Sequence, residues 1–143
     1  MKDFRKILVP FDGSEHAKRA LTRAIYLAEL CGAKLGLLYV VDLNKKISAL
    51  EQVSTGGYVP SELKEEGYQV LASAIHQVPK EVEADNAVEI GRPSEVIIET
   101  CRAGKYDLIV MGSRGLGNIQ QLFMGSVSRY ALYHADCPVM ITR

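Results

Sequence analysis

The chain alternates short, continuous apolar runs with longer segments whose apolar residues recur at helical spacing. The short runs predict five strands, over residues 7–11, 34–41, 87–90, 107–111 and 138–141. The first, second and fourth runs are uninterrupted rather than alternating between apolar and polar residues. Uninterrupted short runs are typical of strands buried on both faces, as in a parallel sheet.

Four amphipathic segments lie between these strands and predict helices. They carry apolar residues at i, i+3, i+4 and i+7 and cover residues 17–31, 63–78, 96–101 and 127–134. Ser14 stands at an N-cap position, Gly32 at a C-terminal stop, and Pro93 near the first residue of the third helix. The regular strand–helix alternation predicts an α/β fold, an open and doubly wound parallel sheet with helices on both faces.

Composition and charge narrow the functional classes. The 143 residues predict a single domain over residues 1–143, and 48% hydrophobic with 24% charged residues is an ordinary globular composition. Lys and Arg (17) balance Asp and Glu (17), so bulk attraction to nucleic acid or to anionic membranes is not expected. The apolar runs are too short for a membrane span or a secretory signal, so we expect a cytoplasmic protein without membrane insertion.

The three cysteines have no paired spacing, which predicts reduced thiols. Cys31 and Cys101 fall on the apolar faces of helices and are expected to pack in the core. Cys137, which precedes Pro138, is expected to be exposed enough to oxidise. No two histidines share a metal-ligand spacing, so no structural metal is expected, and His16 in the first turn of a helix is expected to be exposed.

Residues 42–60 predict an irregular connection rather than a regular element. The segment contains Lys45-Lys46 and the run Ser54-Thr55-Gly56-Gly57. Two interpretations stay open for it, a solvated surface connection or a lid over a ligand.

Candidate chemistry follows two strand ends, where open α/β sheets bind ligands. Residues 10–14 follow the first strand, and the glycine-rich residues 112–118 follow the fourth. Gly125-Ser126 then opens a helix, whose free N–H groups and dipole favour an anion. With the hydroxyls of Ser126 and Ser128 and the guanidinium of Arg114, these residues predict a phosphate cradle. The same residues are equally compatible with a plain glycine-rich turn capped by Ser126.

Other phosphate-binding and catalytic motifs are absent. The chain has no G-x-x-x-x-G-K-[ST] loop, no G-x-G-x-x-G after the first strand, and no G-x-S-x-G elbow. A phospho-receiver domain would need further acids beside Asp12. A flavodoxin-like mononucleotide binder stays open, although its phosphate loop is expected after the first strand.

A family resemblance rests on the spacing of these glycines. The segment Gly112-x₂-Gly115-x₉-Gly125-Ser126 resembles the G-2x-G-9x-G-(S/T) signature of the ATP-binding branch of the universal stress protein family. The segments 7–14, 37–42, 91–93 and 107–113 resemble other parts of that family, so the likeness spans the whole chain.

The resemblance implies a five-stranded sheet in the order 3-2-1-4-5 that binds ATP with Mg²⁺ or Mn²⁺ on its phosphates. Asp12 is expected near the ribose and base, Val40 at the adenine edge, and residues 125–128 on the β- and γ-phosphates. The bulky Phe11 beside Asp12 is expected to alter adenine packing. The nucleotide-binding residues carried over are Pro10, Asp12, Val40, Gly112, Arg114, Gly115, Gly125, Ser126, Val127 and Ser128.

The resemblance also implies a homodimer that pairs the last strand across a two-fold axis. The apolar edge of Val139, Met140 and Ile141 invites such pairing, although Arg143 can also blunt an ordinary edge. We therefore expect an ATP-binding, dimeric stress-response protein that acts as a nucleotide-dependent switch or sensor through a protein partner.

Catalysis is not indicated beyond slow reactions of the bound nucleotide. No Glu or His is placed to orient an attacking water, and no lysine matches the phosphate-transfer templates. Slow ATP hydrolysis, or self-phosphorylation on Ser126 or Ser128, remains an alternative. So do a nucleotidyl-transfer enzyme of the related α/β superfamily and a nucleotide-independent dimeric scaffold.

Overall fold

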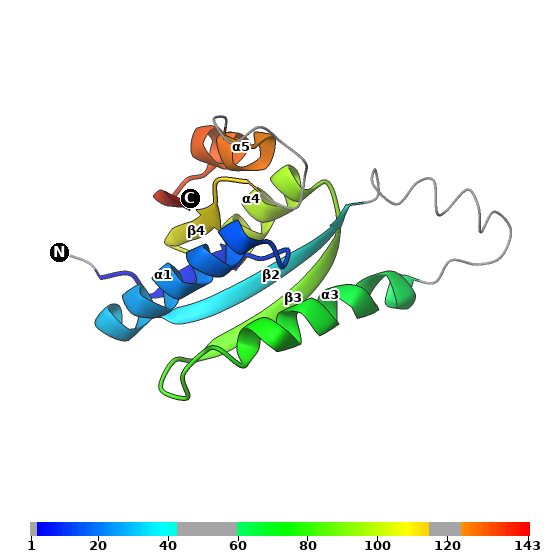
Figure 1. Ribbon diagram of the computed structural model, residues 1–143. Helices are drawn as coiled ribbons and strands as arrows, with labels where there is room; N and C mark the ends of the chain where they lie inside the picture. The colour runs from blue at the N-terminus through cyan, green and yellow to red at the C-terminus, as the bar shows by residue number, and fades with distance from the viewer. Residues whose placement is uncertain (1–2, 43–59, 115–123) are drawn as a thin grey trace, which may run out of the picture.

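The computed structural model describes residues 3–42, 60–114 and 124–143, in which parallel strands form a sheet. The strand order β3-β2-β1-β4-β5 and the parallel pairing confirm the expected α/β architecture (Figure 1). The strands of the described segments are β1 (Lys6–Pro10), β2 (Lys34–Asp42), β3 (Ala84–Gly91), β4 (Leu108–Gly112) and β5 (Val139–Thr142). The helices of those segments are α1 (Glu15–Cys31), α3 (Pro60–Ile75), α4 (Pro93–Ala103) and α5 (Ser126–His134).

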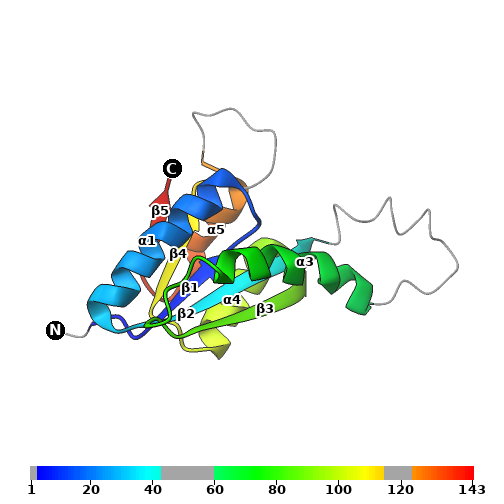
Figure 2. The same cartoon turned by 60° about the horizontal axis from the view of Figure 1, so that its bottom comes forward.

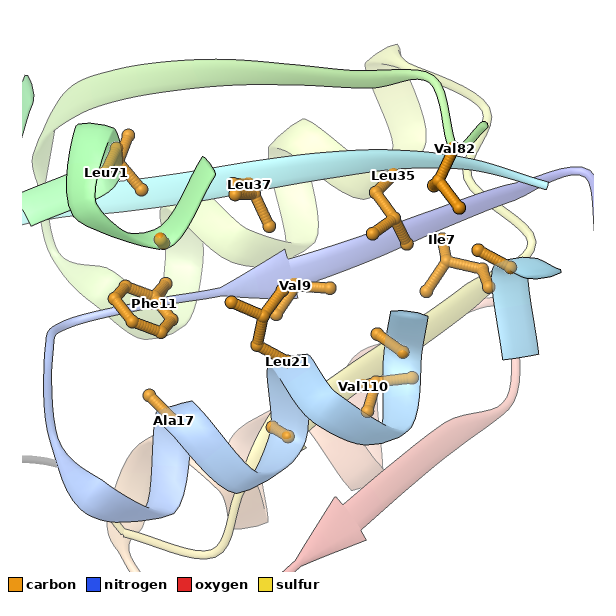
Figure 3. Packing of buried hydrophobic residues seen from close by; sticks show 14 of the residues in the cluster. Ile7, Val9, Phe11, Ala17, Leu21, Leu35, Leu37, Leu71, Val82 and Val110 are labelled. Atoms are coloured by element: carbon orange, nitrogen blue, oxygen red, sulfur yellow. The ribbon is translucent and has the colours of Figure 1, made fainter. Parts of the chain in front are cut away.

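Helices cover both faces of the sheet, as Figure 2 shows. Alternate residues of β1 enter opposite layers, because successive side chains of a strand point to opposite faces. Ile7 and Val9 join the cluster beneath α1 and α3, whereas Leu8 joins the cluster beneath α4 and α5. The first cluster is drawn in Figure 3, where Phe11 lies between Ala17 of α1 and Leu71 of α3.

The boundaries of α1 follow from its flanking residues. Ser14 has extended backbone dihedrals, and its hydroxyl oxygen accepts a hydrogen bond from the N–H of Ala17 (3.1 Å), which makes it the predicted N-cap. Gly32 ends the helix with φ of 69°, a left-handed conformation that glycine adopts without steric cost.

The strand β3 is longer than the apolar pattern predicted. It begins at Ala84 rather than at residue 87, and Asp85 and Asn86 are exposed within it. The strand lies at the edge of the sheet, where polar side chains interrupt the hydrophobic pattern. Lys34 of the neighbouring β2 forms an ion pair with Asp85 (2.6 Å), which accounts for a polar residue at this place.

The direction of winding reverses between β1 and β4. The chain crosses from β1 to β2 through α1 on one face, and from β4 to β5 through α5 on the other. Since β1 and β4 are direct neighbours, their carboxyl ends lie side by side at the switch point, where open α/β sheets bind ligands. Within the described residues, no helix combines the length and apolarity needed to cross a membrane.

Candidate functional site

The turn after β1 is organised by its own side chains. The carboxylate of Asp12 accepts a hydrogen bond from the N–H of Ser14 (2.9 Å), and Gly13 adopts φ of 86° between them. This arrangement is an Asx turn, and it places Asp12 at the carboxyl end of β1 immediately before α1. Pro10 is the last residue of β1, and Val40 lies in β2, the strand paired with β1.

Ser113, directly after β4, joins three segments that are distant in the sequence. Its N–H donates to the carbonyl of Thr142 (2.7 Å), and its carbonyl accepts from the N–H of Gly125 (2.8 Å). Its hydroxyl lies 3.0 Å from Nδ1 of His16. Ser113 therefore fixes the start of α5 and the end of β5 against the first turn of α1.

Ser128 reinforces this junction instead of facing outward. Its side chain is almost fully buried (2% exposed), and its hydroxyl lies within hydrogen-bond distance of the carbonyls of Ser113 (2.8 Å) and Gly125 (3.0 Å). The hydroxyl that residue types suggested as a phosphate donor is thus directed toward backbone acceptors within the chain. Ser126, by contrast, is exposed at the first position of α5.

Two glycines of the spaced signature have packing reasons inside this chain. A Cβ on Gly112 would lie 2.7 Å from Cβ and 2.8 Å from the backbone carbon of His16, closer than carbon atoms approach one another. A Cβ on Gly125 would lie 3.1 Å from the carbonyl oxygen of Ser113, a tight contact. Gly115 lies outside the described residues, and so does the connection over residues 43–59.

The first turn of α5 offers backbone donors at the switch point. The cap residue Gly125 has no side chain, and within the described segments no side chain caps the helix. The first turn holds no acidic residue. The first N–H groups of a helix have no partner within it, and they carry the positive end of the helix dipole. This turn, with Val127 half-buried and Ser126 exposed, therefore suits an anion.

His16 and Thr142 are site residues that the sequence did not predict. His16 was expected to be exposed, which is wrong, because it is half-buried where the first turn of α1 packs against the end of β4. The hydroxyl of Thr142 lies 3.5 Å from the carbonyl of His16. The contact depends on the pairing of Gly112 with Thr142 in the β4–β5 ladder, and no local sequence motif predicts this register.

Two further expectations concern residues around the turn and the sheet edge. Phe11 is 5% exposed within the core cluster. Its bulk therefore packs inside the protein, beneath α1 and α3.

The edge strand β5 was expected to pair with a second copy of the chain. Its residues Val139, Met140 and Ile141 pair with β4 on one side, and β5 is the last strand of the sheet in the described residues. Met140 is 37% exposed there.

Arg114 follows Ser113 directly and is half-buried. Its Cα would lie 3.5 Å from a Cβ added to Gly125, which places Arg114 beside the start of α5. Among the residues described, no group of three His, Cys, Asp or Glu side chains is placed to hold a metal ion.

The open parallel sheet and the helix start at its switch point define a class of α/β protein, and sequence comparison identifies the family. The model of the universal stress protein family matches residues 3–143. A universal stress protein of Thermus aquaticus is 35% identical, and the match covers 98% of this chain and 99% of that protein. The chain belongs to the universal stress protein family.

Solved structures agree with the fold of this chain. The structure of the protein MJ0577 superposes with a TM-score of 0.84 at 26% identity, covering 98% of this chain and 96% of that one. A universal stress protein from Archaeoglobus fulgidus, solved in complex with dAMP, superposes with a TM-score of 0.71 at 22% identity and covers both chains completely. The second likeness, at its lower identity, supports the fold.

Proposed function

We propose that this protein is a member of the ATP-binding branch of its family and binds ATP at the switch point between β1 and β4. The observation that carries the proposal is the first turn of α5, whose backbone donors lie beside the end of β4. The hydrogen bonds of Ser113 with Gly125 and Ser128 hold that turn in place. A preorganised turn needs little rearrangement to accept phosphate oxygens.

Two further observations support an adenine nucleotide. The spacing Gly112-x₂-Gly115-x₉-Gly125-Ser126 resembles the signature of the ATP-binding branch. The Archaeoglobus fulgidus protein, which has the same fold, was solved with dAMP. A zero net charge leaves attraction to phosphate to local groups, and the start of α5 together with Arg114 supplies them.

The proposal gives each residue a role. Asp12 at the end of β1 binds the ribose, while the backbone of Pro10 and Val40 contacts the nucleoside. Arg114 and the glycines of the signature surround the ribose and phosphates, and the backbone of Ser126, Val127 and Ser128 binds the β- and γ-phosphates. Mg²⁺ or Mn²⁺ is held through the phosphates and water, as Mg²⁺ commonly is at nucleotide sites.

Nucleotide binding changes the contacts that this protein makes with a protein partner. A single domain over residues 1–143 contains both the nucleotide site and the surface that contacts the partner. The protein acts in the cytoplasm as a nucleotide-dependent switch or sensor in the stress response. It forms a homodimer through the edge of β5, where the side chain of Met140 is exposed. Of the two serines considered for self-phosphorylation, Ser126 is the exposed one, so any such slow reaction occurs there.

Calorimetry with MgATP tests the binding site directly. In Gly125→Val the added side chain presses on the carbonyl of Ser113 and lies beside Arg114, so we expect it to displace the first turn of α5 and to abolish the heat of binding, while the far-UV circular dichroism spectrum still reports the wild-type helix and sheet content. Gly32→Asn is the matched control, because Gly32 is a glycine with an open surrounding and a left-handed conformation that Asn tolerates. Absence of heat and of a thermal shift for the wild type at millimolar nucleotide would defeat the proposal.

The homodimer is tested separately by sedimentation. Met140→Asp places a charge on the β5 edge, and we expect it to convert a dimer to a monomer. Tyr26→Asp changes an even more exposed apolar side chain on α1 (61% exposed, against 37% for Met140) and should leave the dimer intact. A wild type that sediments as a monomer at all concentrations contradicts this part of the proposal.

A further inference from the structure

Two cysteines that are distant in the sequence meet on the face of the sheet opposite α1. Sγ of Cys101, in the last turns of α4, lies 3.4 Å from Sγ of Cys137, in the segment before β5. The two residues are 36 positions apart. A disulfide bond is about 2.0 Å long, so the sulfur atoms need to approach by only about 1.4 Å to form one.

A second contact holds the same two segments together. Arg102, the neighbour of Cys101, donates from Nε to the carboxylate of Asp136 (2.7 Å), the neighbour of Cys137. Its Nη2 also donates to the carbonyl of His134 (3.3 Å), at the end of α5. These contacts limit the relative motion of the two segments, and therefore keep the thiols close together.

The two thiols differ in access to solvent. Cys101 is 4% exposed, and its sulfur lies 3.7 Å from the carbonyl of Tyr106. Cys137 is half-buried. A small oxidant in solution therefore meets Cys137 first, and Cys101 stands behind it as the thiol that can resolve the product.

We propose that Cys101 and Cys137 form a reversible modification site, at which a small disulfide oxidant such as glutathione disulfide converts the two thiols to an intramolecular disulfide. The proposal is independent of nucleotide binding. In the first step the Cys137 thiolate attacks one sulfur of glutathione disulfide, forming a mixed disulfide and releasing one glutathione thiolate. In the second step the Cys101 thiolate attacks the Cys137 sulfur and releases the second glutathione. The two protein protons end on the two released glutathiones.

The environment of the pair sets the order and the speed of these steps. Burial, the hydrogen bond with Cys137 and the charge of Asp136 raise the pKa of Cys101 to about 12, against a lowering by Arg102. Burial also raises the pKa of Cys137, together with Asp107 and Asp136, but the hydrogen bond from Cys101 lowers it. Cys137, as the more exposed thiol, reacts first, and because both pKa values are raised, oxidation should be slow at neutral pH and accelerate as the pH rises.

The disulfide would connect the end of α4 to the beginning of β5. The carbonyl of Pro138, next to Cys137, accepts the N–H of Ile109 and starts the β4–β5 ladder. The proposed crosslink therefore secures the ladder of the edge strand at its first residue, and oxidation should raise the thermal midpoint of unfolding, reversibly with dithiothreitol.

The experiment incubates the folded full chain with glutathione disulfide, blocks remaining thiols with a maleimide after denaturation, and measures intact mass. The wild type and Cys31→Ser should each lose two reactive thiols without carrying glutathione at Cys137. Cys101→Ser should stop at one glutathione on Cys137, and Cys137→Ser should leave Cys101 free. Cys31, half-buried on α1, is the matched control, and its thiol should react to the same extent in the wild type, in Cys101→Ser and in Cys137→Ser.

Three outcomes would overturn the proposal. One is a wild type that keeps Cys101 and Cys137 free after prolonged incubation at pH 9. Another is a wild type in which the glutathione adduct at Cys137 persists, because Cys101 would then not reach it. The third is a disulfide that includes Cys31, which would require the chain to unfold before it oxidises.

Discussion

Two helices begin near the switch point, and they begin in opposite ways. The start of α1 is closed by its own side chains: Ser14 accepts the N–H of Ala17, and Glu15 supplies a carboxylate in the first turn. The start of α5 has Gly125 at the cap and no acid in the first turn, and the hydroxyl of Ser128 is directed toward backbone carbonyls. The cap of α1 thus occupies one of its first N–H groups, whereas no side chain of the described residues caps the first N–H groups of α5.

The difference also concerns charge. The carboxylates of Asp12 and Glu15 lie at the positive end of α1, where they offset the helix dipole. At α5 no carboxylate of the first turn offsets that positive end, which is where we propose that phosphate binds. A third helix, α4, also lacks a side-chain cap among the described residues, but it begins with Pro93, which has no N–H, and carries Glu95 in its first turn.

The largest expected effect, on nucleotide affinity, comes from placing a carboxylate in the first turn of α5, where α1 has Glu15. Ser126→Asp places a carboxylate at the exposed first position of the helix, where it occupies the proposed phosphate site. We expect affinity for MgATP to fall about a hundredfold, because like charges repel at short range. The free energy of unfolding should rise by about 0.5 kcal/mol, because the carboxylate offsets the dipole.

Calorimetry and urea unfolding of the same samples separate the two effects. Ser126→Asn is the matched control, since it has similar size without the charge and should bind nearly as the wild type does. Loss of stability in Ser126→Asp would show that the α5 turn is not the open helix end described above.

The second-largest effect is expected from removing the N-cap of α1. Ser14→Ala deletes the acceptor for the N–H of Ala17 at a buried position, and the free energy of unfolding should fall by about 1 kcal/mol. Ser14→Thr keeps the hydroxyl and should recover most of that loss. Chemical denaturation measures both, and an unchanged midpoint for Ser14→Ala would mean that α1 does not depend on its cap.

The third effect concerns the buried hydroxyl at α5. Ser128→Ala removes its donor, but the carbonyls of Ser113 and Gly125 keep backbone donors, from Gly125 and Arg129 respectively. The loss in unfolding free energy should be about 1 kcal/mol or less. Because the backbone N–H groups remain, MgATP affinity should change only a few-fold. A complete loss of binding would show instead that the hydroxyl itself contacts phosphate.

The smallest effect is expected at Asp12. Asp12→Asn keeps an oxygen that can accept from the N–H of Ser14, so the turn and the thermal midpoint should be nearly unchanged. Nucleoside affinity should weaken modestly through the lost charge. Asp12→Ala removes both and should lower the midpoint as well. Equal stability of the two variants would exclude a structural role for the turn hydrogen bond.

Local patterns predicted most of the fold. Some signals depend only on neighbouring residues in the sequence, so the elements they mark could be located from it. They are the continuous apolar runs at β1, β2 and β4 and the helix caps Ser14 and Gly32. The sheet order followed from the family resemblance rather than from any run. The strand β3 was predicted short, because its edge position admits polar residues.

Contacts between distant segments could not be predicted in this way. The approach of His16 to Ser113 depends on how α1 packs against the end of β4. The meeting of Cys101 with Cys137 depends on how α4 lies beside the segment before β5. Each distance results from the packing of whole elements, and neither cysteine carries a spacing that reveals its partner.

The close approach of Gly112 to His16 has a consequence for how glycine signatures change over evolutionary time. A side chain at residue 112 collides with the backbone of α1 whether or not a nucleotide is present. Selection for folding alone therefore retains this glycine, even in a lineage that has abandoned the ligand. Drift after such a loss should appear first at Ser126, which is exposed and leaves the junction at Ser113 untouched.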